Sequence, residues 1–152
     1  MRRNRTILFL VAYLCCIAGS VQGQDRKGYA AAVAGWYEGK CFIELMQQEV
    51  DLKLELKRVH ADSVGVKITD FMLPNGQKFS FPTKVVSVKM EVKEGKPVYN
   101  LFASFMYNYS GVPVRITVTG TIKDNMLDSE VKANLMDAVE TKATYKAKKT
   151  GQ

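Results

Sequence analysis

The feature that most constrains this chain is an alternation of apolar and polar residues with period two, repeated along most of its length. The clearest run, Val50 to Lys57, places an aliphatic residue at every second position and a charged residue between each pair. A helix would scatter those aliphatic side chains around its circumference, whereas a strand places them all on one face. The same pattern recurs over residues 64–69, 86–92, 98–107, 114–119, 127–135 and 139–147.

The segments between these runs carry turn signals, among them Pro74-Asn75-Gly76, Glu94-Gly95 and Asp124-Asn125. Because the connections are short, successive strands are expected to be antiparallel neighbours. Phe79 to Phe81 is at most a short extra strand, ended by Pro82. No segment predicts a long helix. Closing such a sheet removes its exposed edges, so we predict an all-β, up-and-down barrel of about eight strands.

The first residues have the features of an export signal. Arg2, Arg3 and Arg5 form a positive segment, and Thr6 to Ala18 is an apolar run of 13 residues, too short to span a bilayer comfortably as a helix. Cleavage after Gly23 is preferred, with Ser20 as the alternative site. Tyr13 and Leu14 precede two cysteines where a lipoprotein signal needs small residues, which favours a protein exported to the periplasm or the exterior without a lipid anchor.

Removing 23 of the 152 residues leaves 129, enough for one domain, and lowers the formal charge from +7 to +4. The predicted division is a signal peptide at 1–23, a flexible leader at 24–33 and a barrel domain at 34–148. The lysines are spread along the chain, which indicates a solvated outer face and no nucleic-acid site. Cys41 is the one cysteine of the mature chain, and its apolar surroundings predict a buried, inert thiol.

Three short motifs resemble those of the calycin-like (lipocalin-like) secreted β-barrel family of Gram-negative gut bacteria. They are Gly35-Trp36-Tyr37-Glu38-Gly39, the loop from Ile68 to Gly76, and the late segment Val118 to Leu127. The resemblance covers roughly residues 33–148. It implies a calycin-type barrel that is exported and has no established enzyme chemistry.

The chain departs from lipocalins proper at two places. Those proteins begin with Gly-x-Trp, whereas Gly35 and Trp36 are adjacent here, and the last strand offers Lys142 and Lys146 where lipocalins carry an arginine. We therefore expect Trp36 to close one end of the barrel, outside the main pocket. A bulge near Gly39 that shifts the parity of the strand is the alternative.

The sequence offers little for catalysis, which requires proton-transferring or nucleophilic groups held together in space. The single histidine, His60, falls in a predicted exposed turn before Asp62 and Ser63. One histidine and one mature cysteine do not supply an ordinary zinc site. No phosphate-binding glycine loop is present. We expect a protein that is not an enzyme and that has neither cofactor nor metal.

The best candidate for a functional surface is the aromatic segment from Tyr99 to Tyr109. One of its faces combines rings with apolar residues and predicts the barrel interior, where tyrosine hydroxyls could orient a ligand. The candidate interior residues are Tyr37, Leu54, Tyr99, Leu101, Phe105 and Tyr107. The other reading is that these rings simply fill the barrel. Phe102 and Met106 are expected on the outer face, where they indicate a partner surface or a covering loop.

The leading expectation is therefore a non-enzymatic binding protein that holds a small, largely apolar molecule. The alternative is a protein-interaction or inhibitor module acting through an exposed apolar rim and loops such as Phe71 to Lys78. A membrane barrel also alternates, but the chain ends Lys148-Lys149-Thr150-Gly151-Gln152 without the terminal aromatic residue usual in such barrels. No membrane insertion is expected.

Overall fold

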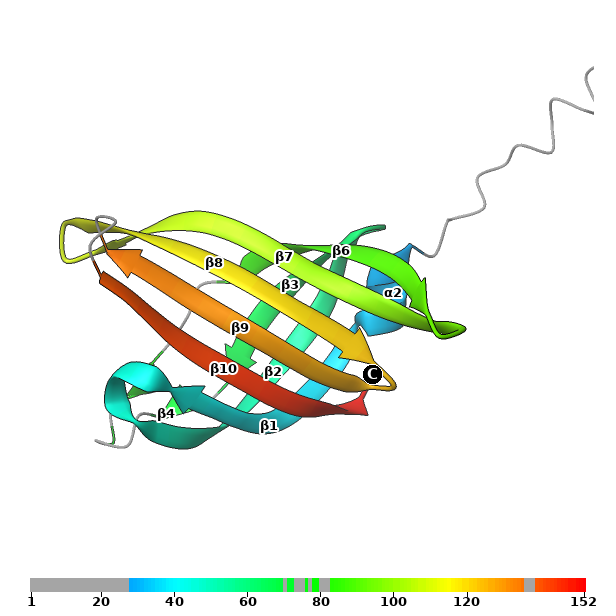
Figure 1. The fold of residues 1–152 in the computed structure, drawn as a ribbon, viewed down its shortest axis with the longest axis horizontal. Helices are drawn as coiled ribbons and strands as arrows, with labels where there is room; N and C mark the ends of the chain where they lie inside the picture. The colour runs from blue at the N-terminus through cyan, green and yellow to red at the C-terminus, as the bar shows by residue number, and fades with distance from the viewer. Residues whose placement is uncertain (1–27, 70, 73–75, 77, 80–82, 136–138) are drawn as a thin grey trace, which may run out of the picture.

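The computed structural model describes residues 28–69, 71–72, 76, 78–79, 83–135 and 139–152. The predicted signal peptide at 1–23 and the first residues of the predicted leader lie outside the described residues. Within them, eight antiparallel strands close into one barrel in the order β1-β10-β9-β8-β7-β6-β3-β2 (Figure 1). The predicted all-β, up-and-down barrel is confirmed.

The barrel strands follow the alternating runs of the sequence closely. They are β1 (Gly35–Ile43), β2 (Gln48–His60), β3 (Ser63–Thr69), β6 (Lys84–Lys93), β7 (Lys96–Tyr109), β8 (Val112–Lys123), β9 (Met126–Leu135) and β10 (Val139–Gly151). A second, two-stranded sheet pairs β4 (Phe71–Met72) with β5 (Lys78–Phe79) between β3 and β6. The predicted extra strand near Phe79 thus begins one residue earlier, and residues 80–82 are not described.

Three tight hairpins explain why consecutive strands are neighbours. Both central residues have positive φ in Glu94-Gly95 (52° and 76°), Ser110-Gly111 (50° and 86°) and Asp124-Asn125 (50° and 63°). Two positive φ values define the turn whose twist matches that of the flanking strands, and Gly, Asn and Asp tolerate it best. The 3₁₀ helix η1 (Glu44–Met46) connects β1 to β2 instead.

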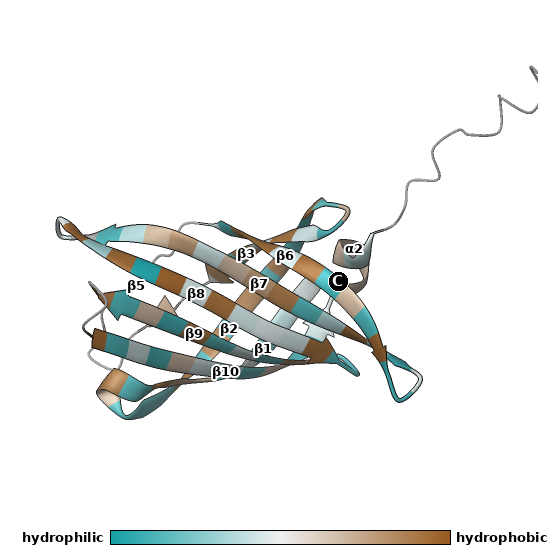
Figure 2. Cartoon of the chain, turned by 45° about the horizontal axis from the view of Figure 1, so that its top comes forward, coloured by the Kyte–Doolittle hydropathy of each residue, from teal (hydrophilic) through white to brown (hydrophobic). Residues whose placement is uncertain are grey.

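Alternate residues of each strand face the barrel interior and the outer surface. Leu52, Leu54 and Leu56 of β2 are 8%, 6% and 2% exposed, while Lys53 and Lys57 between and beyond them face outward. Figure 2 shows the same change from hydrophilic to hydrophobic residues along the other strands. The interior is therefore built from one parity of each strand, as the sequence predicts.

A short helix that the sequence analysis missed covers one end of the barrel. The helix α2 (Tyr29–Val33) lies in the segment predicted to be a flexible leader, and its Ala30 and Val33 are fully buried. The backbone N–H of Ala30 donates to the carbonyl of Ala61 at 2.9 Å, in the β2–β3 hairpin. Five residues are too few for periodicity to reveal a helix, and packing against the barrel stabilises it. No helix of the described residues is long and apolar enough to cross a membrane.

The two ends of the barrel therefore differ. The end covered by α2, called the closed end below, is filled by fully or almost fully buried side chains: Val33, Tyr37, Val64 and Val88. The opposite end, called the open end, carries η1, β4 and the starts of β6, β8 and β10 (Figure 1).

The pairing of β1 with β10, which closes the barrel, depends on a glycine. A Cβ atom at Gly39 would lie 1.9 Å from the carbonyl oxygen of Lys146 and 2.5 Å from the Cα of Ala147. Both atoms belong to the backbone of β10 and cannot move aside. Only glycine lets the first and last strands approach this closely.

We expect Gly39→Ala to lower the free energy of unfolding by roughly 2–3 kcal/mol, the cost of forcing extra volume into a packed backbone contact. Gly65→Ala is the matched control. A Cβ atom there would first meet a side-chain methyl group of Thr83 at 3.2 Å, which can yield. Urea unfolding followed by circular dichroism measures both. Equal stability of the two variants would contradict this account of barrel closure.

Candidate functional site: an apolar cavity in the open half

The open half of the barrel contains a cavity of about 410 Å³. Its lining is almost entirely aliphatic and aromatic, and it includes Met46 of η1 and Tyr107 of β7 at the open end, which are 37% and 36% exposed. The cavity therefore reaches the surface there. The main apolar residues around it are Ile43, Leu52, Leu54, Leu56, Val66, Ile68, Phe71, Leu101, Phe105, Ile116, Val118, Leu127 and Val131.

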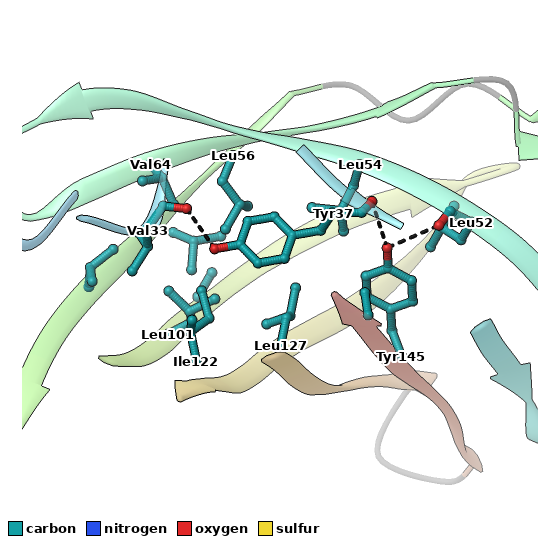
Figure 3. Packing of buried hydrophobic residues seen from close by; sticks show 14 of the residues in the cluster. Val33, Tyr37, Leu52, Leu54, Leu56, Val64, Leu101, Ile122, Leu127 and Tyr145 are labelled. Carbon is teal, nitrogen blue, oxygen red and sulfur yellow. Dashed lines mark hydrogen bonds between the residues drawn. The ribbon is translucent and has the colours of Figure 1, made fainter. Parts of the chain in front are cut away.

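Tyr145 of β10 brings a hydroxyl group into the cavity wall, but backbone carbonyls already engage it. Its oxygen lies 3.0 Å from the carbonyl oxygens of both Tyr37 and Leu52 (Figure 3). A phenol has one proton, which these two acceptors share. Burial raises the pKa of Tyr145, so the hydroxyl stays neutral and structural. It ties the last strand to the first two.

Tyr37 belongs to the closed end and does not line the cavity. Its side chain is fully buried, and its hydroxyl donates to the carbonyl of Val33 in α2 at 2.8 Å (Figure 3). Burial raises the pKa of Tyr37 to about 12. Its ring and the helix together form the floor between the barrel interior and solvent.

The structure brings together four of the six predicted interior residues: Leu54, Leu101, Phe105 and Tyr107 all line the cavity. Tyr37 and Tyr99 do not. Tyr99 is half-buried and pairs with Met90 and Ile122, further toward the closed end. On the opposite face of β7, Phe102 and Met106 are 53% and 57% exposed, as expected.

Trp36 lies on the outer face of the barrel. The prediction from the sequence, that it would lie at the barrel end, is not what the structure shows. Trp36 pairs with Glu55 across β2, and the Nζ of Lys53 lies 5.2 Å from the centre of its ring. The reason is the unbroken parity of β1, whose pairing with β2 has no register shift from Gly35 to Ile43. Trp36 therefore faces away from the inward Tyr37, and no bulge at Gly39 changes this. The register shift beside Trp36 is against β10 alone. Tyr37 and α2 close the end instead.

Lys84, which the sequence analysis did not single out, lines the cavity at the first position of β6. It shares the parity of the inward residues Val86 and Val88, and this shared parity was the available signal. Its Nζ lies 4.8 Å from the ring centre of Phe105 on β7. A cation over an aromatic face is favourable, and more so where water is partly excluded.

The pairing of strands in the barrel wall changes at Lys84. The ladder between β6 and β7 runs from the hairpin to the pair Ser87–Phe102, and beyond it β7 continues pairing with β8 as far as Tyr109. Lys84 instead pairs with Val66 of β3. The strands β6 and β7 therefore separate toward the open end, and the contact of Lys84 with Phe105 lies across that separation.

Cys41 also lines the cavity, 7% exposed and not disulfide-bonded. Burial raises the pKa of its thiol, which keeps it protonated at neutral pH. A neutral thiol is a poor nucleophile and a poor metal ligand. In this setting Cys41 acts as a small apolar side chain of the wall.

Within the described residues, no side-chain hydrogen bond or ion pair joins His60, Asp62 and Ser63. His60 is exposed at the end of β2 and pairs with Ser63 across the hairpin, so its neighbour Asp62 lies in the turn itself. Among the described residues, no three His, Cys, Asp or Glu side chains are grouped so that they could hold a metal ion.

The comparisons with known proteins bear on the fold alone. No protein-family model matches the chain, and no curated protein matches its sequence. Among solved structures, the chain is similar to a "putative outer membrane protein" from Bacteroides fragilis, with a TM-score of 0.51 and 16% identity. The match covers 79% of this chain and 52% of the other, so this chain spans about half the length of that protein.

The buried phenol of Tyr37 predicts a pH dependence of stability. Between its ordinary pKa of 10.0 and about 12, the unfolded chain releases the proton while the folded chain keeps it. The free energy of unfolding therefore falls as pH rises through this window, by up to about 1.4 kcal/mol per pH unit, and is unaffected by this group below it.

In Tyr37→Phe the contribution of Tyr37 to this dependence is absent, while the buried Tyr145, whose pKa is also raised, contributes equally in both proteins. The carbonyl of Val33 also loses its donor. We expect the variant to be less stable by about 1–2 kcal/mol at neutral pH. Its stability should approach that of the native protein as pH rises beyond 10. Urea unfolding of both proteins from neutral pH to about pH 11 tests this. Two parallel stability curves would show that Tyr37 does not titrate in this way.

Proposed function

We propose that this protein is a non-enzymatic binding protein that holds a small, largely apolar molecule in the open half of its barrel. The observation that carries the proposal is the cavity of about 410 Å³ with an almost wholly apolar lining. Ligand pockets typically measure about 300–1,000 Å³ and are lined by apolar and aromatic side chains. A barrel whose rings only filled its interior would leave no such volume.

The chemistry of the wall supports binding over catalysis. The hydroxyl of Tyr145 is engaged by two carbonyls, and the thiol of Cys41 is protonated. Neither group is available to attack or to exchange a proton with a bound molecule. The wall provides apolar surface against which a ligand can be buried. Each Å² of apolar surface removed from water stabilises the complex by about 25 cal/mol.

We also propose that the protein acts after export and without inserting into a bilayer. The export signal predicted at residues 1–23 and the calycin-like motifs support the first part. The outer face supports the second, because it carries ion pairs such as Lys40–Asp51 at 3.0 Å and Lys53–Glu38 at 2.6 Å. A membrane barrel presents an apolar band to lipid.

A second candidate is a protein-interaction module, and one observation favours it. Leu45 of η1, Met72 of β4 and Val139 of β10 are 77%, 54% and 55% exposed around the open end. A protein contact made by this apolar rim would not involve the residues of the barrel interior. Filling the cavity with Ala143→Phe would therefore leave a contact made by the rim intact, while it would remove binding of an apolar ligand.

The test uses a neutral, environment-sensitive fluorophore, N-phenylnaphthylamine. We expect saturable binding to the native protein. We expect Phe105→Ala to weaken it about tenfold, because an aromatic contact in a pocket is worth on the order of 1–1.5 kcal/mol. Fluorescence titration measures both affinities.

The matched control is Phe102→Ala, the same change on the same strand but on the outer face, where the ring is 53% exposed. Its binding should equal that of the native protein. If both variants bind equally well and both are folded by circular dichroism, the interior is not the binding site. No binding by the native protein would contradict the proposed function itself.

A further inference from the structure

The cavity contains one polar feature that a purely apolar ligand would not use. Among the described residues that line it, Lys84 carries the only charge. A cation placed against apolar walls loses hydration and is costly unless something compensates it. The ring of Phe105, 4.8 Å from the Nζ, compensates part of that cost.

An acidic partner is missing from the surroundings of Lys84 in the described part of the chain. The lysines of the outer face are repeatedly paired with carboxylates, as Lys40 is with Asp51 and Lys96 with Asp124. Lys84 forms neither an ion pair nor a side-chain hydrogen bond with any described residue. Its ammonium group therefore keeps the capacity to bind an anion.

The deep part of the cavity offers no comparable group. The hydroxyl of Tyr145 is shared between two backbone carbonyls, and beyond it the closed end is filled by Tyr37 and its apolar neighbours. Among the described wall residues, the other polar side chains are the small Ser129 and Cys41 and, at the open end, Tyr107. A ligand with a charged head and an apolar tail can therefore satisfy both regions in one orientation, with its head at the open end.

We propose that the ligand is an amphipathic anion with a single apolar chain, and that Lys84 holds its acidic head group. The inference rests on the proposed function and specifies the ligand class for the same site. An apolar cavity of about 150 Å³ holds one benzene molecule, so about 410 Å³ has room for a chain of roughly a dozen carbon atoms. A lipid with two long chains exceeds that volume.

The location of Lys84 suits this role. It lies where β6 and β7 separate, with its pairing to Val66 on one side and its contact with Phe105 on the other. An acidic head group there would remain near solvent while the chain lies between Leu101, Val118 and their neighbours. Full burial of the charge is not required, which keeps its desolvation cost low.

Three probes of equal chain length test the proposal by displacing N-phenylnaphthylamine: decanoate, decan-1-ol and decyltrimethylammonium. In the native protein we expect decanoate to bind about tenfold more tightly than the alcohol, the usual scale for a charge-assisted hydrogen bond. The quaternary ammonium probe should bind most weakly. A series of carboxylates should gain up to about fourfold in affinity for each added CH₂ until the cavity is full.

Lys84→Met should reduce the affinity for decanoate about tenfold, to that of the alcohol, and leave the affinity for the alcohol unchanged. Lys84→Glu should reverse the preference between decanoate and the quaternary ammonium probe. The matched control is Lys89→Met, which removes the same charge from the exposed outer face of the same strand. It should bind all three probes as the native protein does.

Two results would overturn the assignment of Lys84 while the proposed function stands. One is equal affinity of native protein and Lys84→Met for decanoate. The other is an equal loss of all three probes in Lys84→Met, which would make the lysine structural. A native protein that binds none of the probes, nor the fluorophore, would instead refute the proposed function together with this inference.

Discussion

The pairing of the first strand with the last is the constraint on which the other features depend. Without β1 against β10, both strands would be edges and the interior would be open along one side. Two residues support this strand pairing. Gly39 lets the two backbones approach, and Tyr145 reaches from β10 to the carbonyls of Tyr37 and Leu52 on β1 and β2. A hydroxyl of the last strand shared between carbonyls of the first two strands thus stabilises the closure from within the core.

Closure at one end leaves the other end free to hold a cavity. An eight-stranded barrel is just wide enough to be filled by side chains or to enclose one small ligand, and this barrel does both in different halves. Tyr37, α2 and the β-branched residues Val64 and Val88 fill the closed half. Stability is therefore concentrated away from the cavity, so the open half need not be packed to capacity for the protein to fold.

Much of the fold was predictable because period two is a strong signal. The leucines of β2, the inward face of β7 and the outward Phe102 and Met106 all follow directly from it. Three features were missed. Helix α2 is too short to show periodicity, and Trp36, expected at the barrel end, instead follows the unbroken parity of β1 to the outer face. Lys84 occupies an inward position of the alternating pattern, but its side chain is charged. A charged residue at an inward position is normally interpreted as the end of a strand.

The charge of Lys84 at this inward position also makes the open end of the cavity chemically different from its deep end. Every connection between neighbouring barrel strands is short except the one from β3 to β6, which contains β4 and β5. The ladder across it has four pairs, Ser63–Ser87 to Val66–Lys84. The wall is thus least extensively hydrogen-bonded beside Lys84, where a polar group can approach from solvent without breaking a long ladder. A lysine at this place adds a charge where its hydration is only partly lost, whereas one at the position of Val86 or Val88 would be buried completely.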